Sequence, residues 1–258
     1  MTSMAALLLL LAAPPGPPPD LPPCPSTDDA PDTSKLLTRF EQVNQGRSSE
    51  AVMAMTIKTP AWTRKLTMKV WSKGEDYALI RVLEGGPRET GMMTLKREKQ
   101  LWNWLPQAGR VMKLPSGMLG DSWLGSDFTN DDLVKGNSMA KDFDAKVDSL
   151  VEVDGRKAWR LVLVPHKDAV VVWNKIELDL DRATCVPLAE RFYDEENKPV
   201  RMMLFADVKQ VGWRAFPATM TVIPQEQGRQ TVIHYDSIAF DADIADETFS
   251  LHRLQQGK

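Results

Sequence analysis

The strongest constraint on the fold is a long series of short segments in which apolar and polar residues alternate. In residues 65–70, Leu66, Met68 and Val70 alternate with lysine and threonine. Because the side chains of a β-strand point alternately to its two faces, this pattern is typical of a strand with one buried face. Similar segments predict further strands at 51–57, 77–83, 91–95, 101–105, 147–153, 156–164, 170–180, 188–193, 200–210, 218–223 and 231–240.

The residues between these segments indicate how the strands are connected. Asp154-Gly155 separates two of them and is the strongest short-range signal for a hairpin. The segments follow one another without the alternation of strands and helices that marks a parallel sheet. The sequence therefore predicts a mainly β domain, built as one long antiparallel meander whose edges must close, pair or be covered.

One helix is predicted ahead of the strands. Asp32 or Thr33 is its N-terminal cap, and Gly46 ends it. Its apolar residues recur at helical spacing, which favours an amphipathic helix. These residues are Leu36, Leu37, Phe40 and Val43.

Residues 115–143 interrupt the strand pattern with several glycines, aspartates and asparagines. Thr129, with Asp132 three residues later, predicts a capped short helix before Leu133 and Val134. Apolar residues such as Trp123 and Phe128 stand among these turn formers. Long loops inside a domain are often lids or binding loops, so we expect this segment to cover a binding site.

The N-terminus predicts export from the cytoplasm. The apolar run at 5–13 is too short to cross a bilayer as a helix, but it fits the apolar core of a secretory signal peptide. Residues 14–31 are a proline-rich linker, and the ordered domain is expected over 32–258. Cys24 and Cys185 are the two cysteines, and a disulfide between them and two free thiols remain alternatives.

Composition and motifs exclude several classes of function. The chain has 32 basic and 35 acidic residues, a balance that argues against a nucleic-acid partner. The sequence contains no Walker, dinucleotide, Cys-x-x-Cys or His-Glu-x-x-His motif, so we expect no cofactor. Four aspartates of the central segment form a cluster without the spacing of a calcium loop, so no metal is expected. We expect them to cap and anchor the lid: Asp121, Asp127, Asp131 and Asp132.

The central segment resembles the signature of a known family, the outer-membrane lipoprotein-sorting proteins of the LolA-like class. The matching residues are Ser116-Gly117 and Asp121-Ser122-Trp123-Leu124-Gly125-Ser126-Asp127-Phe128-Thr129-Asn130-Asp131-Asp132. Further similar runs are Leu101–Pro106 with Arg110-Val111, Phe192-Tyr193-Asp194 with Asn197-Lys198-Pro199, Asp243-Ile244, and Phe249-Ser250. The likeness covers roughly Ser34 to Leu254. At Leu124 the family often has Met, a mild exchange.

The resemblance implies an incomplete β-barrel, a curved antiparallel sheet whose open side is covered by the N-terminal helix and a helical lid. It also implies a periplasmic carrier, without enzymatic activity, that holds the acyl chains of lipoproteins or lipids in an apolar cavity. An inner-membrane transporter and an outer-membrane acceptor are its expected partners.

The candidate site residues follow from this interpretation. Thioether and indole side chains suit a wall that adapts to apolar ligands. The expected acyl-binding residues are Met53, Met55, Met68, Trp102, Trp104, Met118, Trp123, Phe128 and Met202. The expected lid-anchoring residues are Gly125, Ser126, Asp127, Thr129, Asp131 and Asp132.

Two other functions remain as alternatives. One is an accessory subunit that docks on a membrane transporter without carrying cargo. The other is a lipid hydrolase, since Gly120-Asp121-Ser122 is similar to the nucleophile motif of one hydrolase class. Such a serine needs a histidine base oriented by a carboxylate, and the sequence places its three histidines, His166, His234 and His252, far from that pattern. The hydrolase is therefore the less favoured alternative.

Overall fold

The computed structural model describes residues 31–135, 139–169 and 171–257. The predicted signal peptide, nearly all of the linker and Cys24 lie outside the described residues. Cys185 is fully buried and takes part in a disulfide. Among the described residues, no helix has both the length and the apolar character needed to cross a membrane.

The strands account for most of the described chain and match the predicted segments closely. They are β1 (Ser48–Lys58), β2 (Thr63–Lys73), β3 (Tyr77–Glu84), β4 (Met93–Arg97), β5 (Gln100–Leu105), β6 (Arg110–Lys113), β7 (Phe143–Val153), β8 (Arg156–Pro165), β9 (Lys175–Asp181), β10 (Pro187–Tyr193), β11 (Pro199–Val211), β12 (Arg214–Pro224) and β13 (Gln230–Phe240).

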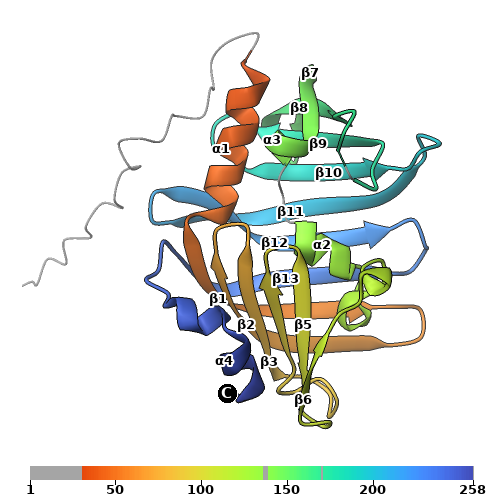
Figure 1. The fold of residues 1–258 in the computed structure, drawn as a ribbon. Helices are drawn as coiled ribbons and strands as arrows, with labels where there is room; N and C mark the ends of the chain where they lie inside the picture. The colour runs from red at the N-terminus through yellow and green to blue at the C-terminus, as the bar shows by residue number, and fades with distance from the viewer. Residues whose placement is uncertain (1–30, 136–138, 170, 258) are drawn as a thin grey trace, which may run out of the picture.

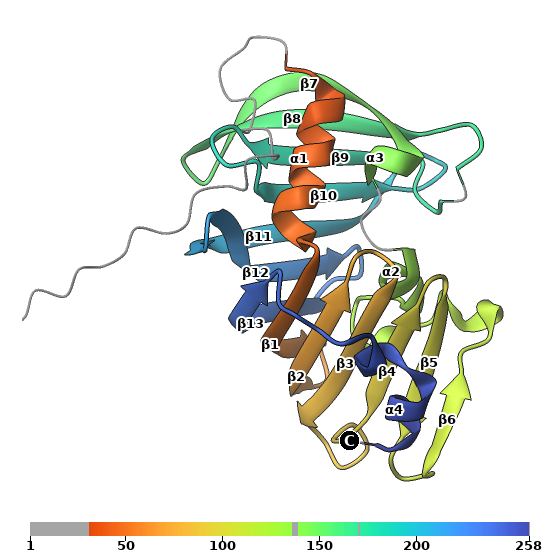
Figure 2. The ribbon, with the colours of Figure 1, turned by 60° about the vertical axis from the view of Figure 1, so that its left-hand side comes forward.

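All of these strands form one 13-stranded antiparallel sheet that curves strongly and does not close (Figures 1 and 2). Each strand pairs with its neighbours in sequence, except that β6 and β7 do not pair with each other. β1 pairs with β13 in the middle of the sheet, and β6 and β7 are the two free edges. The predicted incomplete barrel is confirmed.

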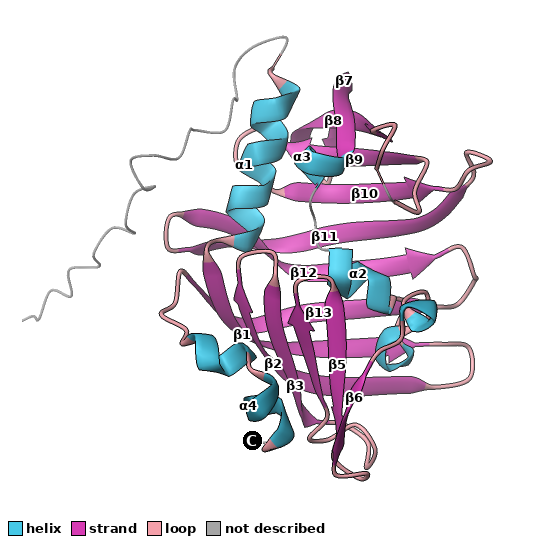
Figure 3. Cartoon of the chain, viewed as in Figure 1, coloured by secondary structure: helices cyan, strands magenta, loops and turns pink. Residues whose placement is uncertain are grey.

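This strand order determines the course of the central segment. β6 and β7 follow each other in the chain but lie at opposite edges of the sheet. The connection must therefore pass from one edge to the other. It contains two 3₁₀ turns, η1 (Ser116–Met118) and η2 (Trp123–Gly125), and two short helices, α2 (Asn130–Lys135) and α3 (Met139–Asp142) (Figure 3).

The N-terminal helix is confirmed with its predicted ends. α1 (Thr33–Gln45) begins after Asp32, whose carboxylate accepts hydrogen bonds from the backbone N–H groups of Ser34 and Lys35. Gly46 ends the helix in a conformation with φ of 64°, which glycine adopts without strain. The buried face of α1 packs with α3 and with β8 and β9 in one apolar cluster on the concave side of the sheet.

The opposite face of the sheet has a separate cover. Leu79 and Ile80 are neighbours on β3 and therefore point to opposite faces, and they belong to different apolar clusters. Leu79 packs beneath the C-terminal segment, which contains η3 (Asp246–Phe249) and α4 (Leu251–Gln255). Both faces of this part of the sheet are thus shielded by the chain itself.

Local predictions were most accurate at turns and least accurate near the lid. Asp154 and Gly155 form the expected hairpin turn, with φ of 48° and 75°. The strand predicted over 170–180 begins only at Lys175, and Val171, Val172 and Trp173 lie in a loop instead. β6 and α4 were not predicted.

A buried carboxylate stabilises the β8–β9–β10 region. The side chain of Asp179 is fully buried and accepts hydrogen bonds of 2.7 and 2.9 Å from Arg160 and one of 2.8 Å from Arg191. Burial alone would raise the pKa of Asp179, but the bonds from the two guanidinium groups outweigh it and hold the pKa below its usual value. The ionised Asp179 carboxylate therefore stabilises the packing of β8, β9 and β10.

We predict that Asp179→Asn lowers the free energy of unfolding at pH 7 by about 3 kcal/mol, because it leaves two arginines without their shared counter-charge. The stability contributed by the low pKa is present above the unfolded-state pKa and is lost as pH falls through the folded-state pKa. The difference between wild type and variant should therefore shrink in acid. Urea denaturation measures it.

Glu196→Gln is the matched control, because Glu196 lies in an exposed turn and pairs only with exposed Lys198. It should change stability by less than about 0.5 kcal/mol. Equal effects of the two variants would contradict the structural role of Asp179.

Candidate functional site

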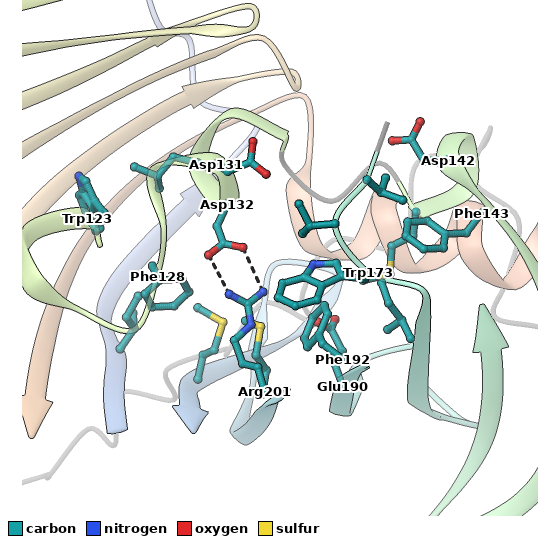
Figure 4. A pocket seen from close by; sticks show the side chains of 18 of the residues that line it. Trp123, Phe128, Asp131, Asp132, Asp142, Phe143, Trp173, Glu190, Phe192 and Arg201 are labelled. Atoms are coloured by element: carbon teal, nitrogen blue, oxygen red, sulfur yellow. Dashed lines mark hydrogen bonds and ion pairs between the residues drawn. The ribbon is translucent and has the colours of Figure 1, made fainter. Parts of the chain in front are cut away.

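A cavity of about 310 Å³ lies between the concave face of the sheet and the connection between β6 and β7 (Figure 4). Residues 114–135 of this connection are called the lid below. Strands β1–β3 and β9–β13 contribute side chains to its walls, as do the lid, α3 and the loop before β9. The lining is mostly apolar, with aromatic and methionine side chains prominent. It therefore has the character of a ligand pocket.

The cavity lies between two separate apolar clusters of the domain. One cluster contains α1, α3 and strands β8–β10, and the other contains β1–β3 with Trp123 and Phe128 of the lid. Met203 on β11 packs against both clusters. The cavity is thus the place where the two halves of the domain meet incompletely.

Asp127 anchors the lid to the far side of the sheet. Its carboxylate accepts a hydrogen bond of 2.7 Å from the hydroxyl of Thr231 and one of 3.1 Å from Arg229 Nε. The backbone N–H of Asp127 also donates to Thr231 Oγ1. Thr231 is fully buried on β13, so this part of the lid is fixed to a rigid strand.

A sharp turn at Leu124 and Gly125 aims the lid aromatics inward. The two residues have φ of 51° and 73°, a conformation that favours glycine. A Cβ atom at Gly125 would lie only 2.8 Å from Arg64 Nη2, which donates a hydrogen bond to the carbonyl of Leu124. Glycine at this position therefore allows both the positive φ of the turn and the close approach of the Arg64 side chain. Trp123 is buried beneath the turn, and its indole N–H donates to Thr94.

The predicted capping pair at the start of α2 is confirmed and has a second role. The backbone N–H of Thr129 donates to Asp132, and the N–H of Asp132 donates back to the hydroxyl of Thr129. The Asp132 carboxylate also accepts bonds of 2.8 and 3.0 Å from the two terminal nitrogens of Arg201 on β11 (Figure 4). This bidentate ion pair joins the helical part of the lid to the floor of the cavity.

Glu190 on β10 is the most unusual group in the cavity wall. It is 3% exposed and lines the cavity between aromatic and methionine side chains. Burial, reinforced by the charge of Asp132 and opposed by that of Arg201, raises its pKa to about 7. A carboxyl group with a neutral-range pKa is therefore present in an apolar pocket.

Three of the nine residues predicted to bind acyl chains line the cavity, namely Met53, Trp123 and Phe128. Met55 and Met68 are fully buried in the adjacent core. Trp102 and Trp104 pack with the C-terminal segment, Met118 is exposed in η1, and Met202 is half-buried on the face of β11 opposite Arg201. Their role in ligand binding stays a prediction.

The residues predicted to anchor the lid make the following contacts. Gly125, Asp127, Thr129 and Asp132 have the roles described above, and the buried hydroxyl of Ser126 donates to the carbonyl of Trp123. Asp131 lines the cavity. Glu190, Arg201 and the 171–173 loop were missed by the sequence analysis, although a charged residue inside an apolar strand pattern is a signal for the first two.

The described residues give no support to metal binding or to a serine nucleophile. No group of three or more His, Cys, Asp or Glu residues is arranged to hold a metal within this part of the chain. The hydroxyl of Ser122 donates to the carbonyl of Ser126. His166, His234 and His252 contact Asp144, Thr219 and Gln256 respectively, and none is a described hydrogen-bond partner of Ser122.

An open, curved antiparallel sheet whose two edges are linked across a cavity is the LolA-like fold, and comparison with known structures agrees. A DUF1329 family protein from Desulfovibrio piger superposes with a TM-score of 0.79 at 22% identity, over 88% of this chain and 100% of the other. A putative outer membrane lipoprotein-sorting protein domain from Vibrio parahaemolyticus gives 0.74 at 20% identity, over 86% and 97%. A LolA superfamily protein from Nitrosomonas europaea gives 0.71 at 17% identity, over 87% and 100%.

At these identities the likeness shows a shared fold. A protein-family model described as "Uncharacterized protein" matches residues 74–256, and the chain belongs to that family. No curated protein matches the sequence. The predicted resemblance to the LolA-like class is therefore confirmed at the level of the fold.

We predict that Asp127→Ala loosens the lid, because it removes the two hydrogen bonds that the carboxylate accepts from Thr231 on β13 and from Arg229 just before that strand. Amide hydrogen exchange of residues 119–132 should accelerate roughly tenfold or more, while β8–β10 stay unchanged. Asp121→Ala is the control in the same segment, since the exposed carboxylate of Asp121 has no described partner. Equal exchange in both variants would refute the anchoring role.

We also predict that Glu190 makes stability fall as pH rises. The folded-state pKa of Glu190 is about 7, above the ordinary value of 4.5. Its contribution to the free energy of unfolding is therefore fully present below pH 4.5 and is lost as pH rises through 7. Between pH 5 and pH 8, wild type should lose up to about 3 kcal/mol relative to Glu190→Gln. Parallel pH profiles of the two proteins in denaturant titrations would contradict this prediction.

Proposed function

We propose that the protein is a non-enzymatic carrier that binds the acyl chains of lipoproteins or lipids in the cavity beneath the lid. The observation that supports this most directly is the apolar cavity itself, which lies between two otherwise complete apolar clusters. A carrier needs apolar surface that water does not fill and that a ligand can reach. The bonds of Asp127 and Asp132 provide a cover that is held by polar contacts and can be released without unfolding the sheet.

The size of the cavity sets the scale of binding. About 310 Å³ is the volume of roughly ten groups the size of a water molecule at ~30 Å³ each, and a methylene is of similar size. Burial of ~ten methylenes at ~0.8 kcal/mol each contributes about 8 kcal/mol, which corresponds to a micromolar dissociation constant before the costs of association. An acyl chain therefore supplies enough free energy for reversible transport.

The proposed location is the periplasm, with export directed by residues 1–13. The similarity in fold to the putative outer membrane lipoprotein-sorting protein domain from Vibrio parahaemolyticus supports this location and this cargo. Under this proposal the protein receives its cargo from an inner-membrane transporter and delivers it to an outer-membrane acceptor. Mass spectrometry of organic extracts from the purified protein would identify co-purifying lipid.

We predict that Val70→Phe weakens acyl binding about tenfold, because Val70 on β2 lines the cavity and a larger side chain occupies the ligand's space. Displacement of a fluorescent lipid with a neutral head group at micromolar protein measures the effect. Val164→Phe makes the same exchange at an exposed position of β8 and should leave binding unchanged.

Absence of any acyl binding by the wild-type protein at micromolar concentration would defeat the carrier proposal. Equal binding by both variants would show that the ligand lies elsewhere. Circular dichroism of both variants checks that each is folded.

A further inference from the structure

The described polar groups of the cavity floor are arranged for a specific chemical partner. Glu190 on β10 lies opposite Met203 on β11, and Phe192 lies opposite Arg201. Glu190 and Arg201 are therefore diagonal neighbours on the same face of the sheet. Both side chains line the cavity, and both are more than nine-tenths buried.

One of these two groups has hydrogen-bonding capacity that the described protein does not use. The terminal nitrogens of Arg201 are occupied by Asp132, but its buried Nε–H has no acceptor among the described residues. The carboxyl group of Glu190 lines the same cavity, and its pKa is set by burial and by the charges of Arg201 and Asp132, with no hydrogen bond among the causes. Buried polar groups are nearly always satisfied, so an unsatisfied guanidinium N–H on a residue of the cavity wall, beside a buried carboxyl group, points to a ligand that completes the site.

The charges of the site restrict what that ligand is. Arg201 is the one basic residue among the described residues that line the cavity, and Asp132 already neutralises it. The remaining charged lining groups, Asp131 and Asp142, are acidic, and in Figure 4 they lie on the side of the pocket away from Glu190. An anionic head group would add an uncompensated buried charge, which is costly. A free fatty acid is therefore a poor fit.

A cationic head group also fits poorly. It would face the guanidinium group of Arg201, whose cation lies 4.9 Å from the ring centre of Trp173 and 4.5 Å from that of Phe192. It would also leave Arg201 Nε–H without an acceptor. A neutral carbonyl oxygen satisfies the site better, because it has two lone pairs and adds no charge.

We propose that the cavity recognises a neutral, single-chain acyl ester or amide, whose carbonyl oxygen accepts hydrogen bonds from the Glu190 carboxyl group and from Arg201 Nε–H. The inference rests on the proposed acyl-binding function and specifies its ligand class. One chain is specified because the cavity holds about 310 Å³. Glu190 acts in its protonated form, which burial favours and which Arg201 and Asp132 influence in opposite directions.

The test compares ligands of one chain length that differ only in the head group. The probes are 1-decanoylglycerol, its ether analogue 1-O-decylglycerol, decanoate and decyltrimethylammonium, titrated calorimetrically into the full-length protein at pH 6. The ester should bind about tenfold more tightly than the ether, which lacks the carbonyl oxygen, and more tightly than either ion.

Variants of Glu190 then test whether this residue causes the preference for the ester over the ether. Glu190→Leu should bind ester and ether equally, whereas Glu196→Leu, in an exposed turn, should keep the wild-type preference. If Glu190→Leu does not fold, wild type and Glu190→Gln still test the inference. The preference for ester should decline in wild type between pH 6 and pH 8 and persist in Glu190→Gln, whose amide keeps a donor.

The outcomes separate this inference from the carrier proposal. Equal binding of ester and ether, tighter binding of either ion, or a preference unchanged in Glu190→Leu overturns the ligand class and leaves acyl binding intact. If none of the four probes binds, both proposals fail.

Discussion

The structure depends on the position of two consecutive strands at opposite edges of one sheet. β6 and β7 have no strand partner beyond them in the described sheet, so a single curved layer results in place of a closed barrel. The residues that join them then have to pass over the concave side. A covered hollow is the geometric consequence of this strand order, and the apolar clusters on either side of it follow from the alternation of each strand.

The lid is held by a few polar contacts that differ in kind. Asp127 binds a buried threonine and an arginine near β13, whereas Asp132 forms a bidentate ion pair with Arg201 on β11. The first contact lies at the start of β13, and the second lies at the floor of the cavity. Arg201 is also a neighbour of Glu190. The same residue therefore holds the lid and influences the charge of the cavity floor.

Features encoded by neighbouring residues could be predicted from the sequence. The Asp32 cap, the Asp154-Gly155 turn and the Thr129–Asp132 capping pair each depend on residues within one turn of chain, and all three are present. The 171–173 segment was misread because an apolar run has the same appearance whether it is a buried strand or the wall of a cavity. Its side chains line the pocket without belonging to β9.

The floor of the site could not be predicted because it is assembled from distant residues. Glu190, Arg201 and Asp132 come from two strands and a helix, and only the register of β10 on β11 brings the first two together. Residue type alone was also misleading for the lining. Met68 lies directly opposite Met53, yet only Met53 lines the cavity. Which segment covers which face, as the C-terminal segment covers Trp102 and Trp104, is a property of the whole chain.

The pairing of β1 with β13 has a consequence for how the molecule is made. These strands stand near the two ends of the domain but form the seam at the centre of the sheet. During vectorial synthesis, the first strand therefore lacks its final neighbour until almost the entire chain has emerged. The hollow between strands β1–β6 and strands β7–β13 is complete only once the last strand has paired with the first.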